Sequence, residues 1–354
     1  MKVTTYETYV ARVPYEDSRM PAPQVILRLL TDEGLEGIAY VTPLMRWAIA
    51  PIRATVAALA EQVVGRDPLA VESISSELLG QLTRPQFDGL RRSAAGLVDI
   101  ALWDLKARAL GLPLWRLLGG SEGKVRAYAS WNLWYQYDID TLARHGAEAV
   151  ERGFRAMKYR LGGVKTLSES VARTKALREA VGPDVQLMVD MNWSWTVDKT
   201  IRIGRELEEY ELTWIEDPIP ADQYDGLARI STALQTPVCA GETYHEASQF
   251  HAALQRRAID IAMIDLECGG ITEWLKLASL VKTYRVPVAS HTCTEVSMHV
   301  VAASGSMIVE YIPWMVPLLK EVPPVVDGYI ELPDSPGLGV ELDMPALKHF
   351  AVQS

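Results

Sequence analysis

The sequence predicts an α/β fold in which parallel strands, each followed by a helix, close into a barrel. Between residues 157 and 310, short apolar runs recur, and most of them end in a charged or titratable residue. Successive ends lie 23 to 26 residues apart, which leaves room for one helix in each interval. The runs are continuously apolar, as is typical of strands buried on both faces. Eight such units form a barrel whose chemistry lies at the carboxyl ends of the strands.

The ends of the predicted strands carry the candidate site. The strands are predicted at 125–130, 155–160, 185–189, 212–215, 237–241, 259–264, 286–290 and 307–310. Five of them are followed directly by Asp190, Glu216, Glu242, Asp265 and His291. A single acidic residue after a strand is often only a helix cap or part of a turn. Five titratable residues at five successive strand ends are hard to explain by capping, so they predict a functional site.

The chain before the barrel has a different pattern. Residues 3–13, 24–30 and 35–41 predict a small antiparallel sheet, with Asp32-Glu33-Gly34 as a hairpin turn. Residues 46–111 have the period of amphipathic helices. The glycines near residue 120 favour a boundary there, so we expect one domain at 1–120 and the barrel at 121–325. Residues 326–354 do not continue the repeat, and we expect them to pack back on the first domain.

A long loop at residues 14–23 separates the first two strands. It contains prolines and the charged residues Glu16, Asp17 and Arg19. Loops of this length are often lids over binding sites. A surface loop with no role is an equally good interpretation. If the loop is a lid, Tyr15 and Arg19 are candidate substrate contacts.

Composition excludes several classes of partner. The net charge is −10 and the pI is near 5.2, which argues against nucleic acid because phosphate binding needs clustered Lys and Arg. No apolar run approaches the ~18 residues of a membrane span, and the N-terminus lacks the apolar core of a signal peptide. The three cysteines are widely spaced, as in proteins of a reducing compartment. We therefore expect a cytoplasmic protein with no membrane partner.

Three of the strand-end residues predict a metal site. Asp190, Glu216 and Glu242 offer oxygen ligands from consecutive strands. Oxygen ligands without thiol or imidazole suit a hard divalent cation, and Mg²⁺, one per site, is our prediction. Without a cation, three neighbouring carboxylates would repel one another.

The remaining polar residues predict acid–base chemistry. Asp265 and His291 end neighbouring strands, and an Asp beside an imidazole fixes its tautomer and favours the ring after it has taken a proton. Period-two alternation places Lys158 and Arg160 together on one face of their strand. Glu310, at the last strand, could exchange a hydrogen bond with a substrate carboxylate.

These motifs together resemble the enolase superfamily, specifically its mandelate racemase subgroup, over essentially the whole chain. The matching segments are Val-Asp-Met-Asn around Asp190, Trp-Ile-Glu-Asp-Pro around Glu216, Ala-Gly-Glu ending at Glu242, and Glu-Cys-Gly-Gly shortly after Asp265. The resemblance implies three metal ligands, an Asp–His dyad, and Glu310 as the electrophilic carboxyl group.

The resemblance also implies a fold and a partial reaction. The fold is a modified TIM barrel, (β/α)7β, under an α+β capping domain that the C-terminal segment completes, with residues 14–23 as a specificity loop. The implied reaction is abstraction of the proton α to a carboxylate through a metal-stabilised enediolate, which is the general scheme of the superfamily.

One position departs from the family pattern, which on the second strand is commonly Lys-x-Lys. Here the pair is Lys158 and Arg160, and a guanidinium is a poor proton acceptor. We therefore expect an acid-sugar dehydratase, in which His291 acts first as base and then as acid. A racemase or epimerase of a 2-hydroxy acid would need Lys158 or Arg160 as a base on the opposite face. A third interpretation is a non-catalytic binder of metal and carboxylate that keeps the fold.

The predicted partner is a small-molecule carboxylate. Its candidate contacts near the strand ends are Asn192, Trp134 and Trp314, besides Tyr15 and Arg19. Aromatic side chains there either stack on sugars or pack between the barrel and the capping domain. We also expect a homo-oligomer, although no residue pattern determines its size.

Overall fold

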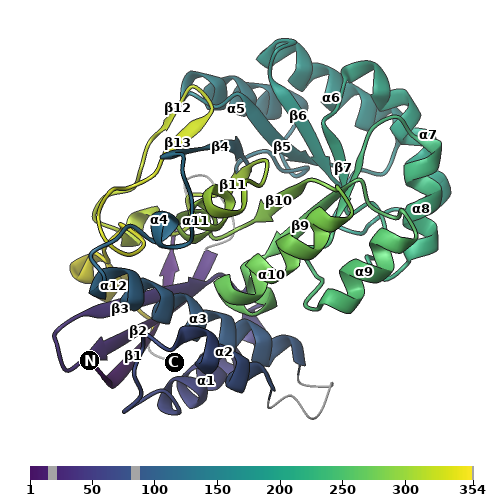
Figure 1. Ribbon diagram of the computed structural model, residues 1–354. Coiled ribbons are helices and arrows are strands. Elements are labelled where there is room, and N and C mark those ends of the chain that lie inside the picture. The colour runs from purple at the N-terminus through teal and green to yellow at the C-terminus, as the bar shows by residue number, and fades with distance from the viewer. Residues whose placement is uncertain (15–21, 81–87, 353–354) are drawn as a thin grey trace.

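The computed structural model describes residues 1–14, 22–80 and 88–352 (Figure 1). The chain begins with an antiparallel sheet in the order β1 (Val3–Val13), β2 (Ala22–Thr31) and β3 (Glu36–Val41). Helices α1 (Arg46–Glu61), α2 (Val71–Gly80) and α3 (Asp88–Ala109) form the rest of this capping domain, and the short α4 (Leu114–Leu117) leads to the barrel. The predicted α+β domain is therefore present.

The start of β2 differs from the prediction. Ala22 and Pro23, which the sequence predicts to be part of the 14–23 loop, pair with Val13 and Arg12 of β1. Proline is compatible with this strand because the pairing with β3 reaches only Val25, so a backbone N–H at Pro23 would have no ladder partner on that side of the described sheet. Tyr15 and Arg19, with the rest of the lid from 15 to 21, lie outside the described residues.

Within the described residues, eight parallel strands close into a barrel. They are β4 (Lys124–Ala129), β5 (Ala156–Arg160), β6 (Gln186–Asp190), β7 (Trp214–Glu216), β8 (Val238–Ala240), β9 (Ile261–Asp265), β10 (Val288–His291) and β11 (Val309–Tyr311). The first seven pair in chain order. β11 closes the ring because it pairs with β4 on one side, while Ile308 bridges to Ala289 of β10 on the other.

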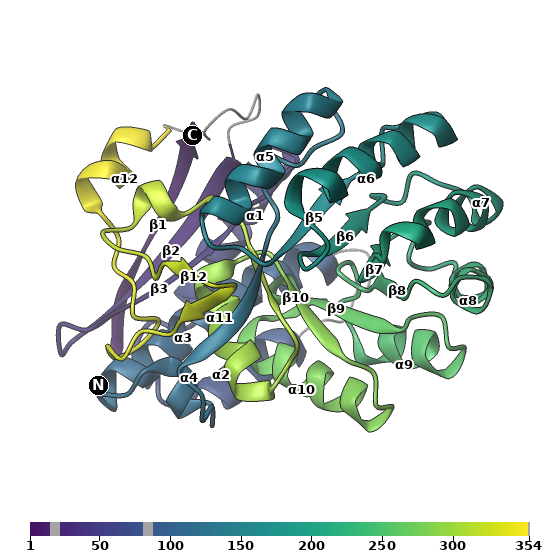
Figure 2. The same ribbon diagram turned by 90° about the horizontal axis from the view of Figure 1, so that it is seen from above.

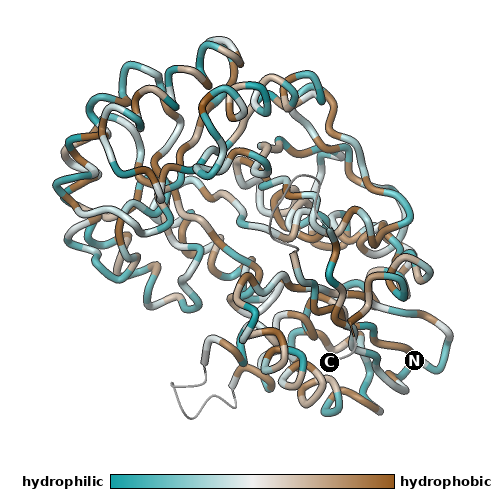
Figure 3. Tube along the Cα trace, turned by 180° about the vertical axis from the view of Figure 1, so that it is seen from behind, coloured by the Kyte–Doolittle hydropathy of each residue, from teal (hydrophilic) through white to brown (hydrophobic). Residues whose placement is uncertain are grey.

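Helices surround the strands (Figure 2). They are α5 (Ile139–Glu151), α6 (Leu167–Val181), α7 (Val197–Leu207), α8 (Tyr224–Ala233), α9 (Ala247–Gln255), α10 (Gly270–Thr283) and α11 (Thr294–Ser304). The outer helices alternate between hydrophobic and hydrophilic along their length (Figure 3), as expected of one buried and one exposed face. The (β/α)7β barrel expected from the resemblance is confirmed. No helix in the described residues has both the length and the apolarity to cross a membrane.

The helix starts are encoded locally. Asp138, Thr166 and Thr196 precede α5, α6 and α7, and each side chain accepts a hydrogen bond from a backbone N–H in the first turn of its helix. Such caps satisfy donors that have no partner inside the helix. Because each cap lies in the loop after a barrel strand, it also limits the path of that loop.

The chain's last segment contacts both parts of the molecule. β12 (Val325–Val326) and β13 (Tyr329–Glu331) form a hairpin, and β13 pairs with the first residues of β4. Further on, α12 (Met344–Phe350) is followed by Val352, whose N–H donates to the carbonyl of Val10 in β1. We keep the division at residues 120 and 325 as a proposal, with one adjustment: the hairpin extends the barrel sheet, and only the later residues reach the capping domain.

Candidate active site

Strand β5 shows how the sequence directs side chains into the barrel. Ala156 belongs to a small buried cluster inside the barrel, whereas Met157 and Tyr159 belong to the core outside it. The Tyr159 hydroxyl hydrogen-bonds the Thr174 hydroxyl on α6 at 2.6 Å. Lys158 and Arg160, in phase with Ala156, therefore point into the barrel and are buried.

The same period of two selects most other polar site residues. The inner cluster includes Tyr128, Met188, Trp214, Met263, Ala289 and Ile308. Each of these six residues is followed, two positions later, by a polar residue near the carboxyl end of the strand. In the same order, the polar residues are Ser130, Asp190, Glu216, Asp265, His291 and Glu310. Because side chains two residues apart on a strand point the same way, the inward-facing positions give the barrel an apolar floor and, one step closer to the carboxyl ends, a polar rim.

Glu242 is the exception to this period. The inner cluster includes Cys239, so the next inward position on β8 would be residue 241, a glycine. Gly241 has φ +126°, and an added Cβ would lie 2.8 Å from the carbonyl oxygen of Met263. The strand ends here, and the glycine redirects the chain. As a result the Glu242 carboxylate approaches His291, with 3.1 Å between Oε2 and Nε2.

His291 and Asp265 form the predicted pair. Asp265 Oδ2 hydrogen-bonds Nδ1 of His291 and also accepts from the Thr292 hydroxyl at 3.1 Å. Because Nδ1 is occupied, Nε2 is the nitrogen left to face a substrate. Burial alone would lower the pKa of His291, but the carboxylates of Glu242, Glu310 and Asp265 raise it well above 6.5. The side chain keeps 21% of its surface exposed, so a ligand can reach it.

Lys158 lies on the floor of the site between two carboxylates. Its Nζ pairs with Glu216 Oε1 and, at 3.1 Å, with Glu310 Oε1. Burial lowers the pKa of Lys158, but the two carboxylates outweigh it and hold the pKa well above 10.5. Burial alone would raise the pKa of Glu310, but the positive charges of Lys158, His291 and Arg160 outweigh burial and lower the pKa to about 2. In this arrangement Lys158 is a cation, and Glu310 accepts hydrogen bonds.

Arg160 is fixed by its neighbours. Its guanidinium donates to the Ser130 hydroxyl at 3.0 Å and lies 3.8 Å from the ring centroid of Trp134. Its Nε is 3.7 Å from Asp190 Oδ2, and Nη2 is 3.9 Å from Glu310 Oε1. Arg160 thus sits at the rim as a fixed positive charge between two carboxylates.

The three predicted metal ligands lie within electrostatic reach of one another. The pKa of Glu216 is raised to about 8, because burial and the carboxylates of Asp190, Glu242 and Glu310 outweigh the opposing effect of Lys158. Asp190 accepts from the N–H of Asn192 at 2.7 Å and from its side-chain amide at 2.9 Å. The Trp214 indole donates to Glu216 at 2.8 Å.

Comparison with known proteins places these residues in a family. Residues 2–119 match the family described as the mandelate racemase / muconate lactonizing enzyme N-terminal domain. Residues 141–346 match the family described as enolase C-terminal domain-like. The chain belongs to the enolase superfamily. Within it, the match to the N-terminal domain confirms the mandelate racemase subgroup.

Individual superfamily members resemble this one along its whole length. D-galactarolactone cycloisomerase of Agrobacterium fabrum is 31% identical over 99% of each chain. L-talarate/galactarate dehydratase of Salmonella typhimurium is 31% identical over 91% of this chain and 81% of that protein. The crystal structure of L-talarate dehydratase from Polaromonas, complexed with Mg and L-glucarate, superposes with a TM-score of 0.90 at 29% identity, covering 99% of this chain and 98% of the other.

This superfamily member has side chains suited to a divalent cation. Both carboxylate oxygens of Asp217, which follows Glu216, are buried without a hydrogen-bond partner among the described residues. Such groups are costly unless a cation or water compensates them. As they stand, however, no three acidic, His or Cys side chains of the described chain converge into a ready-made cage. Lys158 pairs with Glu216, Asn192 donates to Asp190 and His291 pairs with Glu242 instead, so a cation would have to replace these contacts.

The predicted substrate contacts have different surroundings. Trp134 covers Arg160, and Asn192 donates to Asp190, so both border the site. Trp314 lies three residues beyond β11 and is partly buried. Their contact with substrate stays a prediction.

Sequence reasoning missed two residues that organise the rim. Ser130 holds Arg160, and its position in phase with Tyr128 could have revealed it. Thr292 donates its backbone N–H to Glu310 at 2.8 Å and its hydroxyl to Asp265. It has φ +47°, a backbone conformation that the sequence does not indicate for a threonine.

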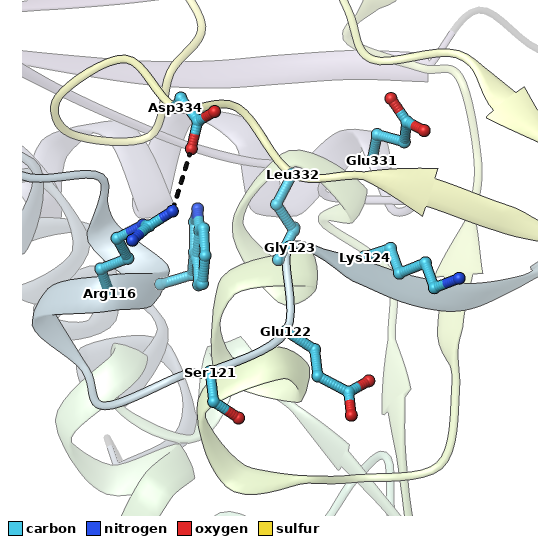
Figure 4. A pocket seen from close by; sticks show the side chains of 9 residues that line it. Arg116, Ser121, Glu122, Gly123, Lys124, Glu331, Leu332 and Asp334 are labelled. Atoms are coloured by element: carbon cyan, nitrogen blue, oxygen red, sulfur yellow. Dashed lines mark hydrogen bonds and ion pairs between the residues drawn. The ribbon is translucent and has the colours of Figure 1, made fainter.

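A separate hollow of about 630 Å³ lies at the other end of the barrel (Figure 4). It is lined by Lys124, the first residue of β4, together with Trp115, Arg116 and Asp334. Arg116 and Asp334 form an exposed ion pair across it at 3.5 Å. Chemistry in this fold occurs at the carboxyl ends of the strands, so this hollow is not the active site.

Proposed function

We propose that the protein is a Mg²⁺-dependent dehydratase of acid sugars. It removes the proton α to a substrate carboxylate and then the β-hydroxyl. The observation that carries the proposal is the imidazole of His291, which is held by Asp265 through Nδ1 and lies 3.1 Å from Glu242, together with Arg160 in place of a second base. The named relatives that share the fold include a dehydratase of acid sugars and one complexed with Mg and L-glucarate.

His291 performs both proton transfers in this reaction. Nε2 accepts the α-proton, and Asp265 stabilises the resulting imidazolium through Nδ1–H. The electrons of the broken C–H bond move toward the carboxylate, and then form a Cα–Cβ double bond as the β C–O bond breaks. The proton on Nε2 goes to the departing hydroxyl, so water leaves and the enol becomes a 2-keto acid.

The cation would be held by Asp190, Glu216 and Glu242, and when bound it would stabilise the negative charge that develops on the substrate carboxylate. Lys158 and Arg160 add fixed positive charge beneath and beside the same region. Glu310 accepts the N–H of Thr292 and so orders the loop that carries His291.

A racemase would need a second acid–base group on the opposite face. Lys158 is fully buried, and its ammonium group is held between Glu216 and Glu310. A guanidinium such as Arg160 does not release its proton at neutral pH. The dehydratase is therefore the better fit to this arrangement.

The test is proton NMR in D₂O with Mg²⁺ and a panel of mono- and diacid sugars. We expect loss of the β-hydroxyl and formation of a 2-keto acid. His291→Asn should lower kcat by at least about 10³-fold, because the proposed base is lost. The matched control is His251→Asn on α9, away from the strand ends, which should stay active.

Inversion at Cα without loss of water would indicate a racemase, and ligand binding without any exchange would indicate a non-catalytic binder.

We also propose that the protein works in the cytoplasm as a homo-oligomer. All three cysteines, Cys239, Cys268 and Cys293, are buried free thiols, which fits a reducing compartment. Light scattering on the purified protein tests the oligomeric state, and a mass equal to one chain would contradict it.

A further inference from the structure

A series of hydrogen bonds connects the capping domain to the catalytic pair. It begins at Ser93 on α3, whose hydroxyl donates to Glu267 Oε2 at 3.0 Å. The backbone N–H of Glu267 donates to Asp265 Oδ1 at 2.6 Å. Asp265 Oδ2 in turn binds Nδ1 of His291. Three steps therefore lead from a helix of the first domain to the imidazole.

Helix α3 and the turn that carries Glu267 are in close contact, so neither can shift without moving the other. At Gly96 of α3, an added Cβ would lie 2.8 Å from the Gly270 nitrogen and 3.0 Å from the Leu266 carbonyl oxygen. One turn further along α3, Asp99 accepts the N–H of Thr272 at 3.0 Å. Because backbone meets backbone here, a shift of α3 is transmitted directly to the turn.

The turn matters because it holds the second oxygen of Asp265. Residues Leu266–Cys268 form a short 3-10 helix, and Asp265 is its N-cap. Oδ1 is held by the Glu267 N–H, which leaves Oδ2 for His291 and Thr292. If the turn moves, the carboxylate rotates and the imidazole rotates with it. A displacement of about 1 Å at a reacting group can cost a factor of about 10² in rate.

We propose that Ser93 and Glu267 are positioning residues for the Asp265–His291 pair, through which the capping domain orients the base. Neither side chain is among the predicted metal ligands or substrate contacts. Ser93 is buried, and Glu267 is partly buried against it. The inference rests on the proposed function of His291 and extends it to the capping domain, which contains none of the proposed catalytic residues or metal ligands.

Three variants separate geometry from charge. Ser93→Ala and Glu267→Ala each break the first link and should lower kcat about tenfold, with KM for the acid sugar within about twofold of wild type. Glu267→Gln keeps an oxygen that accepts from Ser93 and keeps the backbone N–H, so it should retain kcat. The double variant Ser93→Ala/Glu267→Ala should be no slower than either single one, because both remove the same interaction.

A matched control weakens the same interface without reaching Asp265. The Trp103 indole on α3 donates to the Thr272 hydroxyl at 2.9 Å, on the helix beyond the turn. Trp103→Phe removes this bond and should lower the unfolding midpoint while leaving kcat unchanged. A loss of kcat in Trp103→Phe equal to that in Ser93→Ala would mean that general loosening explains both, and would overturn the proposal.

A second readout does not depend on turnover. In protein labelled with ¹⁵N-histidine, the Nδ1–H proton of His291 is identified by its absence in His291→Asn. Ser93→Ala and Glu267→Ala should shift or broaden this signal, whereas Trp103→Phe should leave it in place. An unchanged signal in Ser93→Ala overturns the proposal, as does an unchanged kcat in an active protein. A wild type that exchanges no α-proton contradicts the proposed function instead, and the NMR comparison still decides the positioning role.

Discussion

The single residues of the site are buried charges that compensate one another. Lys158 is fully buried and lies between Glu216 and Glu310, which are also buried. Removing one member of such a set leaves another charge without a partner, at a cost of about 3–5 kcal/mol. Each buried charge is therefore stable only while the oppositely charged neighbours are present.

A buried residue outside the site makes stability depend on pH. His299 on α11 is fully buried, its Nε2 hydrogen-bonds the Leu338 carbonyl at 3.0 Å, and its Nδ1 has no partner among the described residues. Burial lowers its pKa from 6.5 to about 4. Between pH 6.5 and pH 4, His299 is therefore protonated in the unfolded chain but stays neutral in the folded chain. The free energy of unfolding should therefore fall as the pH drops from 6.5 toward 4, and this contribution is retained above 6.5.

Urea denaturation at pH 7 and pH 5 measures this effect. His299 alone should reduce the free energy of unfolding by about 2 kcal/mol between these two values. His299→Gln keeps an N–H donor but does not titrate, so its loss between pH 7 and pH 5 should be smaller by that amount. If the free energy of unfolding fell equally in the variant and the wild type, the pKa of His299 would not be lowered in the folded protein.

The strands are the elements that the sequence predicted best. On β5, Ala156, Lys158 and Arg160 point inward and Tyr159 points outward, as period-two alternation requires. The direction of Glu242 could not be derived that way, because it depends on the positive φ of Gly241 and on the Met263 carbonyl of the next strand. Likewise, nothing in the local pattern of α3 indicates that Ser93 meets Glu267, since that contact exists only after the two domains pack.

Gly241 should tolerate no side chain. In Gly241→Ala, the methyl group would lie 2.8 Å from the Met263 carbonyl oxygen at φ +126°, so we expect a loss of several kcal/mol, composed of about 1–3 kcal/mol of backbone strain and an added clash. Gly34→Ala is the matched control, because Gly34 has φ +77° with open space around it and should lose only about 1–2 kcal/mol. Thermal and urea unfolding measure both losses. Similar values would refute the steric explanation.

For the molecule as a whole, the capping domain and the barrel are joined beside the site. Besides the contacts of α3, the Tyr40 hydroxyl of β3 hydrogen-bonds Glu295, in the first turn of α11 after His291. Asp104 binds the N–H groups of Ile38 and Leu338 and so connects the sheet to the C-terminal segment. Residues from the first and last thirds of the chain thus stabilise one arrangement.

Mg²⁺ should stabilise the whole fold through the three acidic ligands. A ligand that binds only the folded state at 100 times its Kd adds about 2.7 kcal/mol to the free energy of unfolding. We expect such a gain for the wild type when urea denaturation with Mg²⁺ is compared with denaturation in EDTA. Glu242→Gln should lose most of it. Glu341→Gln, which breaks only the exposed pair with Lys320, should keep it. An undiminished gain in Glu242→Gln would exclude that residue as a ligand.

The last described residues have a consequence for the order of folding. The N–H of Val352 donates to the carbonyl of Val10 in β1, and β4 pairs with both β11 and β13, so residues far apart in the sequence become neighbours. Such contacts form late, because the entropy cost of closing the long loop between the partners comes first. Until then β4 has unpaired edges, so we expect neither the capping sheet nor the barrel to reach its final form before the C-terminal segment has packed against both.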